Sequence, residues 1–337
     1  MSLVLLQPSR LPYTEQELRV TQDAPAPLLL ARRLAAGLSS TDLLERLRVL
    51  PAAPHGDEPA PYTGPAGRPE IAYTYDERLR EFDAFFDVVR VDRPADGVFS
   101  RGLLVAYRSL LEEGMAAGTR MSWADWSSLC ATLQEMICLA VGEDRTAGRV
   151  AVSEPPLLRW HMDPHRRWRV GHQVFFVLTQ CVIVALQSFR SALAEEDLAA
   201  ARRNLRLVTR LFNGSAAAFV FTSEFSAGQY ENGVRPSMEP PFVSPGFSGL
   251  LSPDHLYMVK LFARLRPVLR ALPAELAPDH RAFVRALGTV YESHKYVCRR
   301  FGGDTGSSLR TSDASALPAV DVIHALKLAR TKIVGRS

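Results

Sequence analysis

Residues 279–301 read DHRAFVRALGTVYESHKYVCRRF. Six side chains in this stretch recur at intervals of three or four residues: Phe283, Leu287, Val290, His294, Cys298 and Phe301. Side chains at that spacing share one face of an α-helix. The pattern therefore predicts a helix over 279–301 with one continuous stripe turned towards the protein core.

The same spacing of apolar residues runs through most of the chain, whereas the alternation that is typical of strands is scarce. We therefore expect an all-α fold. The predicted helices cover residues 27–50, 76–89, 97–117, 123–141, 170–193, 197–225, 253–272, 279–301 and 319–333. Two start signals support this assignment, because Ser122 with Asp125 resembles a capping box and Ser252 precedes a proline at a first helical position.

Two stretches interrupt the helical pattern. Residues 51–69 are rich in Pro, Gly and Ala and predict a loop. Residues 226–251, SAGQYENGVRPSMEPPFVSPGFSGLL, form a long connection, and such loops inside a compact domain are usually either functional or disordered. Three aromatic residues in it favour packed order: Tyr230, Phe242 and Phe247. We expect an N-terminal arm over 1–75 and a helical domain over 76–337.

Composition limits the classes of protein to consider. The chain has 337 residues, of which 47% are hydrophobic, and this is enough to bury a large core and to exclude global disorder. Lys and Arg number 40 against 36 Asp and Glu, which gives a formal net charge of +4. An excess this small does not indicate a nucleic-acid partner.

The cysteines and the apolar runs indicate a cytoplasmic protein. Four widely separated cysteines do not make a disulfide-stapled secreted scaffold. Residues 1–7 lack the charged start and long apolar core of a signal peptide. Polar residues interrupt the apolar run over 174–189, which is shorter than the roughly 20 residues that cross a bilayer. We expect a buried helix there and no membrane association.

The pair His294 and Cys298 carries the strongest chemical signal. On the predicted helix, an imidazole and a thiol face the core about 6 Å apart along the axis. This arrangement suits a haem whose iron takes the imidazole and whose vinyl carbon takes the sulfur. The alternative is a core cysteine beside a core histidine. Zinc fits less well because two ligands do not complete a tetrahedral site, and the Cys-x-x-Cys-His signature of c-type haem is absent.

A second histidine, His255, lies in the predicted first turn of the helix that follows the long connection. The positive end of a helix dipole favours a neutral imidazole, which can accept a proton. The alternative is a first-turn histidine that hydrogen-bonds water or the loop.

The segment from Arg235 to His255, followed by His294-x3-Cys298, resembles the histidine-ligated haem-dependent aromatic oxygenases, the superfamily that includes tryptophan 2,3-dioxygenase. Within it, the chain is most similar to members that hydroxylate 3-methyl-L-tyrosine in saframycin biosynthesis and attach haem through one thioether at a His-x3-Cys motif. The resemblance covers about residues 150–301, and it implies a helical fold.

The resemblance implies that His294 is the axial ligand of the haem iron, Cys298 the thioether cysteine and His255 the distal acid and base. It implies that hydrogen peroxide hydroxylates a tyrosine ring beside its phenol. The implied product is a catechol, 3-hydroxy-5-methyl-L-tyrosine, used to build a tetrahydroisoquinoline antibiotic. The oxidant could also be dioxygen with a reductant.

We expect a small aromatic amino acid as substrate. A planar guanidinium binds a carboxylate through two hydrogen bonds, so we assign the substrate carboxylate to Arg235. Tyr230 and Asn232 are candidate polar contacts in the same loop. The alternative for Arg235 is a solvated loop residue. Relatives often assemble through N-terminal arms, so a homo-oligomer is possible.

The histidines His161, His165 and His172 invite a metal-site interpretation. Pro164 disfavours a regular helix between the first two, so a solvated entry to a helix is the favoured alternative. The neighbouring Arg166, Arg167 and Arg169 could instead pair with haem propionates.

Other functions stay open at this stage. One is oxygenation of indole or tryptophan, as in the tryptophan-cleaving relatives. Another is a haem-binding sensor without turnover, which would keep protein ligands on both sides of the iron. A third is a helical interaction module without a cofactor, which would be colourless.

Overall fold

The structure is a computed structural model that describes residues 2–18, 71, 73–92, 97–140, 153–303 and 318–335. The predicted helix over 27–50 and the predicted loop over 51–69 lie outside the described residues.

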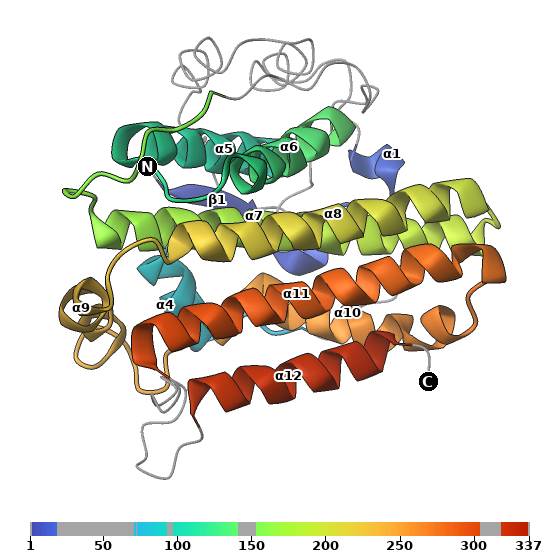
Figure 1. The fold of residues 1–337 in the computed structure, drawn as a ribbon. Helices are drawn as coiled ribbons and strands as arrows, with labels where there is room; N and C mark the ends of the chain where they lie inside the picture. The colour runs from blue at the N-terminus through green and yellow to red at the C-terminus, as the bar shows by residue number, and fades with distance from the viewer. Residues whose placement is uncertain are drawn as a thin grey trace.

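The long helices stack in layers around a central antiparallel pair, α7 and α8 (Figure 1). Helices α5 and α6 cover one side of this pair, and α10 and α11 cover the other, with α12 packed outside α10 and α11. The bounds are α5 Val98–Ala117, α6 Trp123–Ala140, α7 Pro164–Ala194, α8 Leu198–Thr222, α10 Pro253–Arg270, α11 Ala277–Gly302 and α12 Ala319–Val334. The predicted all-α class is confirmed.

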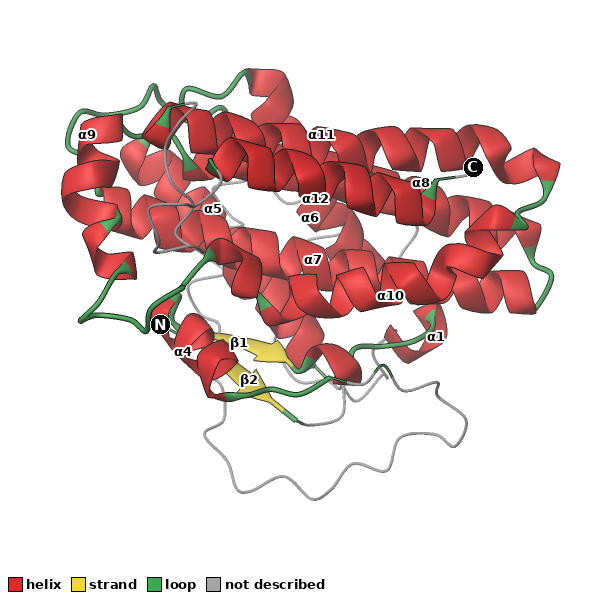
Figure 2. Cartoon of the chain, turned by 90° about the horizontal axis from the view of Figure 1, so that it is seen from below, coloured by secondary structure: helices red, strands yellow, loops and turns green. Residues whose placement is uncertain are grey.

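The N-terminal residues add a short parallel sheet to the helices (Figure 2). Strand β1, Leu3–Leu6, pairs with β2, Val88–Val91, and Leu3 lies opposite Val88. The predicted helix over 76–89 is therefore wrong at its C-terminal end, because α4 covers only Glu77–Phe85. Four-residue strands show too few alternations to be recognised in the sequence. A short helix α1, Glu15–Leu18, follows β1.

The division into an arm over 1–75 and a domain over 76–337 stays a prediction. The start of that arm packs within the helical layers, because Leu3, Leu5 and Leu6 are fully buried and β1 contacts α5.

Helix α7 explains the longest apolar run. Asp163 caps its start by accepting a hydrogen bond from the backbone N–H of His165 at 2.9 Å, and Pro164 takes the first helical position. Among the described helices, α7 alone is long and apolar enough to cross a membrane, but 89% of its most apolar window is buried inside the protein. The prediction of a buried helix over 174–189 is confirmed.

Helices α10 and α11 bear the predicted site residues. Ser252 caps α10 and Pro253 follows it, as predicted, and α10 ends one turn after Pro267. In α11 the predicted stripe faces inwards. Its apolar members are buried, namely Phe283, Leu287, Val290 and Phe301. Its two polar members, His294 and Cys298, are half-buried.

The connection over 226–251 is ordered into short turns. They comprise α9 Ala227–Gln229, a π-helical turn Tyr230–Val234, and 3-10 turns Pro236–Met238 and Gly249–Leu251. Tyr230 and Phe247 are buried, which confirms packed order for these two residues. The inference fails for Phe242, whose side chain is 72% exposed.

Candidate active site

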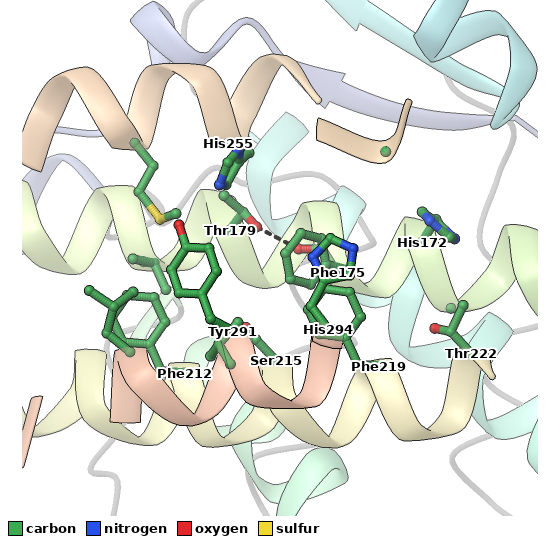
Figure 3. Close-up of a pocket in the computed structure, with 16 residues that line it drawn as sticks. His172, Phe175, Thr179, Phe212, Ser215, Phe219, Thr222, His255, Tyr291 and His294 are labelled. Atoms are coloured by element: carbon green, nitrogen blue, oxygen red, sulfur yellow. Dashed lines mark hydrogen bonds between the residues drawn. The ribbon is translucent and has the colours of Figure 1, made fainter. Parts of the chain in front are cut away.

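A cavity lies where α7, α8, α10 and α11 meet (Figure 3). Three histidines from three different helices border it: His172 from α7, His255 from α10 and His294 from α11. Most of the remaining wall is apolar, with Phe175, Val182, Phe212, Phe219, Met258, Leu287 and Val290.

A second cavity adjoins the first. Five residues border both spaces: His172, Phe219, Thr222, Gly249 and His294. The second cavity adds Trp168, Tyr230, Arg235, Met238, Cys298 and Phe301 to its wall. The pair predicted from the sequence therefore lies at the junction, with His294 on both cavities and Cys298 on the second.

His294 is held by aromatic packing. Its ring stacks on Phe219 of α8 at a centroid distance of 4.8 Å and an interplanar angle of 17°. Burial, together with the nearby His255 and His172, lowers the pKa of His294 to about 3. The imidazole is therefore neutral near pH 7, which is the state that binds a metal.

Cys298 lies one turn beyond His294 on α11 and is half-buried against the core. Burial raises the pKa of its thiol to about 11. The sulfur is therefore a neutral thiol near pH 7. A flat macrocycle at the junction of the two cavities could contact His294 through its metal and Cys298 through its edge.

His255 lies in the first turn of α10, where its backbone N–H donates to Ser252 Oγ at 3.5 Å. Its ring points into the first cavity from the opposite side to α11 (Figure 3). The predicted distal histidine and the predicted axial histidine thus border one space.

A buried charge network fixes the start of α10, and sequence reasoning missed it. Arg90 of β2 donates to both carboxylate oxygens of Asp254 at 2.8 and 2.6 Å, and to Asp83 of α4 at 3.1 and 3.2 Å. Gln180 of α7 donates to Asp254 at 2.9 Å. All three charged side chains are at most 1% exposed. Because Asp254 directly precedes His255, this network fixes the position of the first turn of α10, in which His255 lies.

His172 is a second residue that sequence reasoning did not place in the site. Its Nδ1 lies 2.8 Å from the Trp168 carbonyl oxygen, and its ring stacks on Phe86 at 4.4 Å. Burial lowers the pKa of His172 to about 4, so this imidazole is also neutral near pH 7. The sequence did contain a signal for it, because His172 is a polar residue in a largely apolar helix. A buried polar group requires a partner, so such a residue is a candidate for a site.

The three predicted substrate contacts occupy different environments. Arg235 borders the second cavity, and its guanidinium pairs with Glu239 at 3.1 Å and Glu231 at 3.5 Å. Tyr230 is buried in the wall and stacks on Phe301 at 4.3 Å. Asn232 is exposed and donates to the Gly228 carbonyl, and it does not border either of the two cavities described here.

The histidines considered as a metal site do not come together. His161 and His165 are exposed, whereas His172 faces the cavities. Among the residues that the structure describes, no three His, Cys, Asp or Glu side chains are grouped to hold a metal ion. Arg166 and Arg167 bind Glu113 at 2.7 and 3.1 Å, and none of Arg166, Arg167 and Arg169 borders the two cavities described here, so a pairing of these arginines with haem propionates stays a prediction.

The residues present fit a haem. His294 is a neutral nitrogen donor with apolar neighbours, and a deep cavity opens beside it. His294 and Cys298 lie on one helix at the spacing that two attachments to one macrocycle require.

Comparisons with known proteins point to one family. A family model described as SfmD 3-methyl-L-tyrosine peroxygenase matches residues 4–282. The 3-methyl-L-tyrosine peroxygenase of Streptomyces lavendulae is 29% identical over 332 aligned positions, and the match covers 94% of this chain and 86% of the relative. A crystal structure of reduced SfmD, prepared by soaking with sodium hydrosulfite, matches with a TM-score of 0.67 at 27% identity. That match covers 87% of this chain and 96% of the SfmD chain.

Proposed function

Because the chain belongs to the SfmD 3-methyl-L-tyrosine peroxygenase family, we propose that it hydroxylates the phenol ring of 3-methyl-L-tyrosine, or of tyrosine, with hydrogen peroxide. One oxygen atom of the peroxide enters the ring and the other leaves as water, so the products are a catechol and water. The observation that carries this proposal is that His255 and His294 border the same cavity from opposite sides. The catechol would serve the biosynthesis of a tetrahydroisoquinoline antibiotic.

The cofactor of this proposal is haem, which His294 would hold through its iron and Cys298 through one thioether. When bound, haem supplies an iron centre that activates peroxide for oxygen transfer to an electron-rich ring. The neutral state of His294 supports its role, because a protonated imidazole cannot bind a metal. The stack on Phe219 holds the ring in one orientation.

His255 would move the proton that peroxide chemistry requires. Peroxide must lose a proton from one oxygen, and its other oxygen must gain a proton to leave as water. A single imidazole within hydrogen-bond reach can perform both transfers. Its place in the capped first turn of α10 supports this role, because the network around Asp254 fixes the backbone there.

Arg235 would bind the substrate carboxylate, with Tyr230 as a neighbouring contact, while the contact predicted for Asn232 draws no support from the two cavities, which Asn232 does not border. Arg235 borders the second cavity, and its two glutamate partners are themselves exposed. A substrate carboxylate could replace one glutamate and keep a bidentate contact. The wall that Tyr230 forms with Phe301 would hold the aromatic ring or the side-chain stem.

Turnover by the purified holoenzyme tests the function. With hydrogen peroxide, we expect 3-methyl-L-tyrosine to gain one oxygen atom and form the catechol, as measured by liquid chromatography and mass spectrometry. L-Tryptophan is the matched alternative substrate. Oxygenation of tryptophan alone would overturn the choice of substrate, and a colourless protein would overturn the proposed cofactor. Replacing peroxide with dioxygen and a reductant distinguishes the two oxidants.

The thioether gives a separate prediction. We expect acidified acetone to leave the haem on the wild-type protein and to extract it from Cys298→Ala, because only the variant lacks the carbon–sulfur bond. The alkaline pyridine haemochrome band should also shift, since one vinyl group is saturated in the wild type. Cys138→Ala is the control, because Cys138 is a half-buried cysteine on α6 away from both cavities. Complete extraction from the wild-type protein would show that no thioether forms.

A cytoplasmic location and a homo-oligomer assembled through the N-terminal arm remain predictions. Analytical ultracentrifugation of the full chain measures the second of these directly.

A further inference from the structure

The hydrogen bond from His172 fixes which ring nitrogen carries its hydrogen. Nδ1 lies 2.8 Å from the backbone carbonyl oxygen of Trp168. A carbonyl oxygen only accepts hydrogen bonds, so Nδ1 must carry the hydrogen. In a neutral imidazole the other nitrogen, Nε2, is then an acceptor with a lone pair.

The surroundings of His172 direct this acceptor towards the cavities. Phe86 stacks on the ring at 4.4 Å, and Trp168 packs against it at 4.3 Å. Nε2 lies close to Gly249, where a Cβ atom would be 3.9 Å away. Both His172 and Gly249 border the two cavities, and Gly249 is exposed. A ligand can therefore approach Nε2 from the cavity side.

Three of the hydroxyl groups that border the first cavity have already used their hydrogens, and the Tyr291 hydroxyl borders it as well. Thr179, Ser215 and Thr222 each donate to the carbonyl oxygen four residues earlier, at 2.8, 2.9 and 2.6 Å. Much of the remaining wall is aromatic or aliphatic. A polar group buried against this wall needs a directed partner, because leaving a buried hydroxyl unpaired is unfavourable.

The lone pair on Nε2 determines which ligand groups can form a hydrogen bond with it. A lone pair repels a carboxylate, so a haem propionate or an amino-acid carboxylate is a poor neighbour for this tautomer. A neutral O–H donor is a suitable neighbour, because it can donate its hydrogen to Nε2. Among the functional groups of the proposed substrate, the phenol is a neutral donor attached to an apolar ring, which matches one acceptor in an aromatic wall.

We propose that His172 binds the phenol hydroxyl of the substrate, accepting its hydrogen bond at Nε2. This inference rests on the proposed function. The contact would hold the ring in one orientation, so that the carbon beside the phenol is presented for hydroxylation. It would also increase the electron density of the ring. A site built to bond a hydroxyl strongly rejects analogues that lack it, so His172 would distinguish tyrosines from phenylalanines.

Two substitutions of His172 test the roles of its two ring nitrogens separately. His172→Asn places an amide N–H near the position of Nδ1, so it can still bond the Trp168 carbonyl, but it has no group at Nε2. His172→Gln reaches further and can present an amide oxygen near Nε2. The exposed His165 lies on the same helix, and His165→Asn is the matched control.

The test measures the binding of two ligands to each holoprotein by isothermal titration calorimetry without peroxide. We expect His172→Asn to weaken binding of 3-methyl-L-tyrosine about 10- to 100-fold, because its phenol loses a buried partner. Binding of 3-methyl-L-phenylalanine, which lacks the hydroxyl, should change less than about 3-fold, since it forms no such bond. His172→Gln should recover most of the loss, and His165→Asn should match the wild type.

The outcomes distinguish this inference from the proposed function. If the wild type binds and hydroxylates 3-methyl-L-tyrosine but His172→Asn binds it equally well, the phenol contact is wrong and the function stands. Equal losses for both ligands would also reject the contact, because they would indicate a changed cavity shape. If the wild type does not bind 3-methyl-L-tyrosine, the proposed function and the contact are both wrong.

Discussion

The His294→Ala variant is expected to turn over 3-methyl-L-tyrosine more than about 100-fold slower than the wild type and to lose most of its haem during purification. Groups that only support a metal ligand contribute about 10- to 100-fold to affinity or activity, so removal of the ligand itself should cost more. Turnover number and the haem-to-protein absorbance ratio measure the two effects. Any haem that remains in this variant would be held by the proposed thioether to Cys298 alone.

Chemical rescue distinguishes ligation from structural support. His294→Ala leaves a space beside Phe219, and added imidazole can enter it and restore part of the spectrum and the turnover. His280→Ala is the control, because His280 is also buried in α11 but its Nε2 donates to the Val334 carbonyl oxygen, 2.7 Å away, and it does not border either cavity described here. Wild-type turnover by His294→Ala would assign the iron to another histidine of the cavity.

Sequence periodicity was sufficient for the part of the site that lies on one helix. The stripe of α11 repeats every three or four residues, so the common direction of His294 and Cys298 follows from helix geometry alone. The capped start of α10 was also recognisable from Ser252 and Pro253, and with it the first-turn position of His255. These features depend on residues close in the sequence.

Contacts between distant segments could not be predicted in the same way. Strand β1 has four residues, and its partner β2 lies beyond a long stretch of chain, so no local pattern marks either strand. His172 looked like a member of a solvated helix entry together with His161 and His165, because its cavity appears only when α7 packs against α8 and α10. Arg90 carries no local signal of its two carboxylate partners.

The Arg90→Met variant is expected to lower the free energy of unfolding by about 3–5 kcal/mol, because it leaves two buried carboxylates without their counter-ion. Asp83 and Asp254 are at most 1% exposed, so water does not replace the lost partner. Burial already raises the pKa of Asp83, which Arg90 opposes. Urea unfolding followed by circular dichroism measures the change. Arg10→Met is the control, because Arg10 pairs with Asp92 in a partly exposed ion pair and should cost less than about 1 kcal/mol.

Removing the carboxylate charges as well tests the cause of this loss. In the triple variant Asp83→Asn, Arg90→Met, Asp254→Asn, the amide oxygens can still accept from Tyr75 and Gln180, which donate to these carboxylates at 2.7 and 2.9 Å. We expect it to recover at least half of the lost stability, since no buried charge remains uncompensated. If the triple variant is as unstable as Arg90→Met, the arginine acts through packing and not through charge. Because Asp254 adjoins His255, turnover should recover together with stability only if the network positions the start of α10.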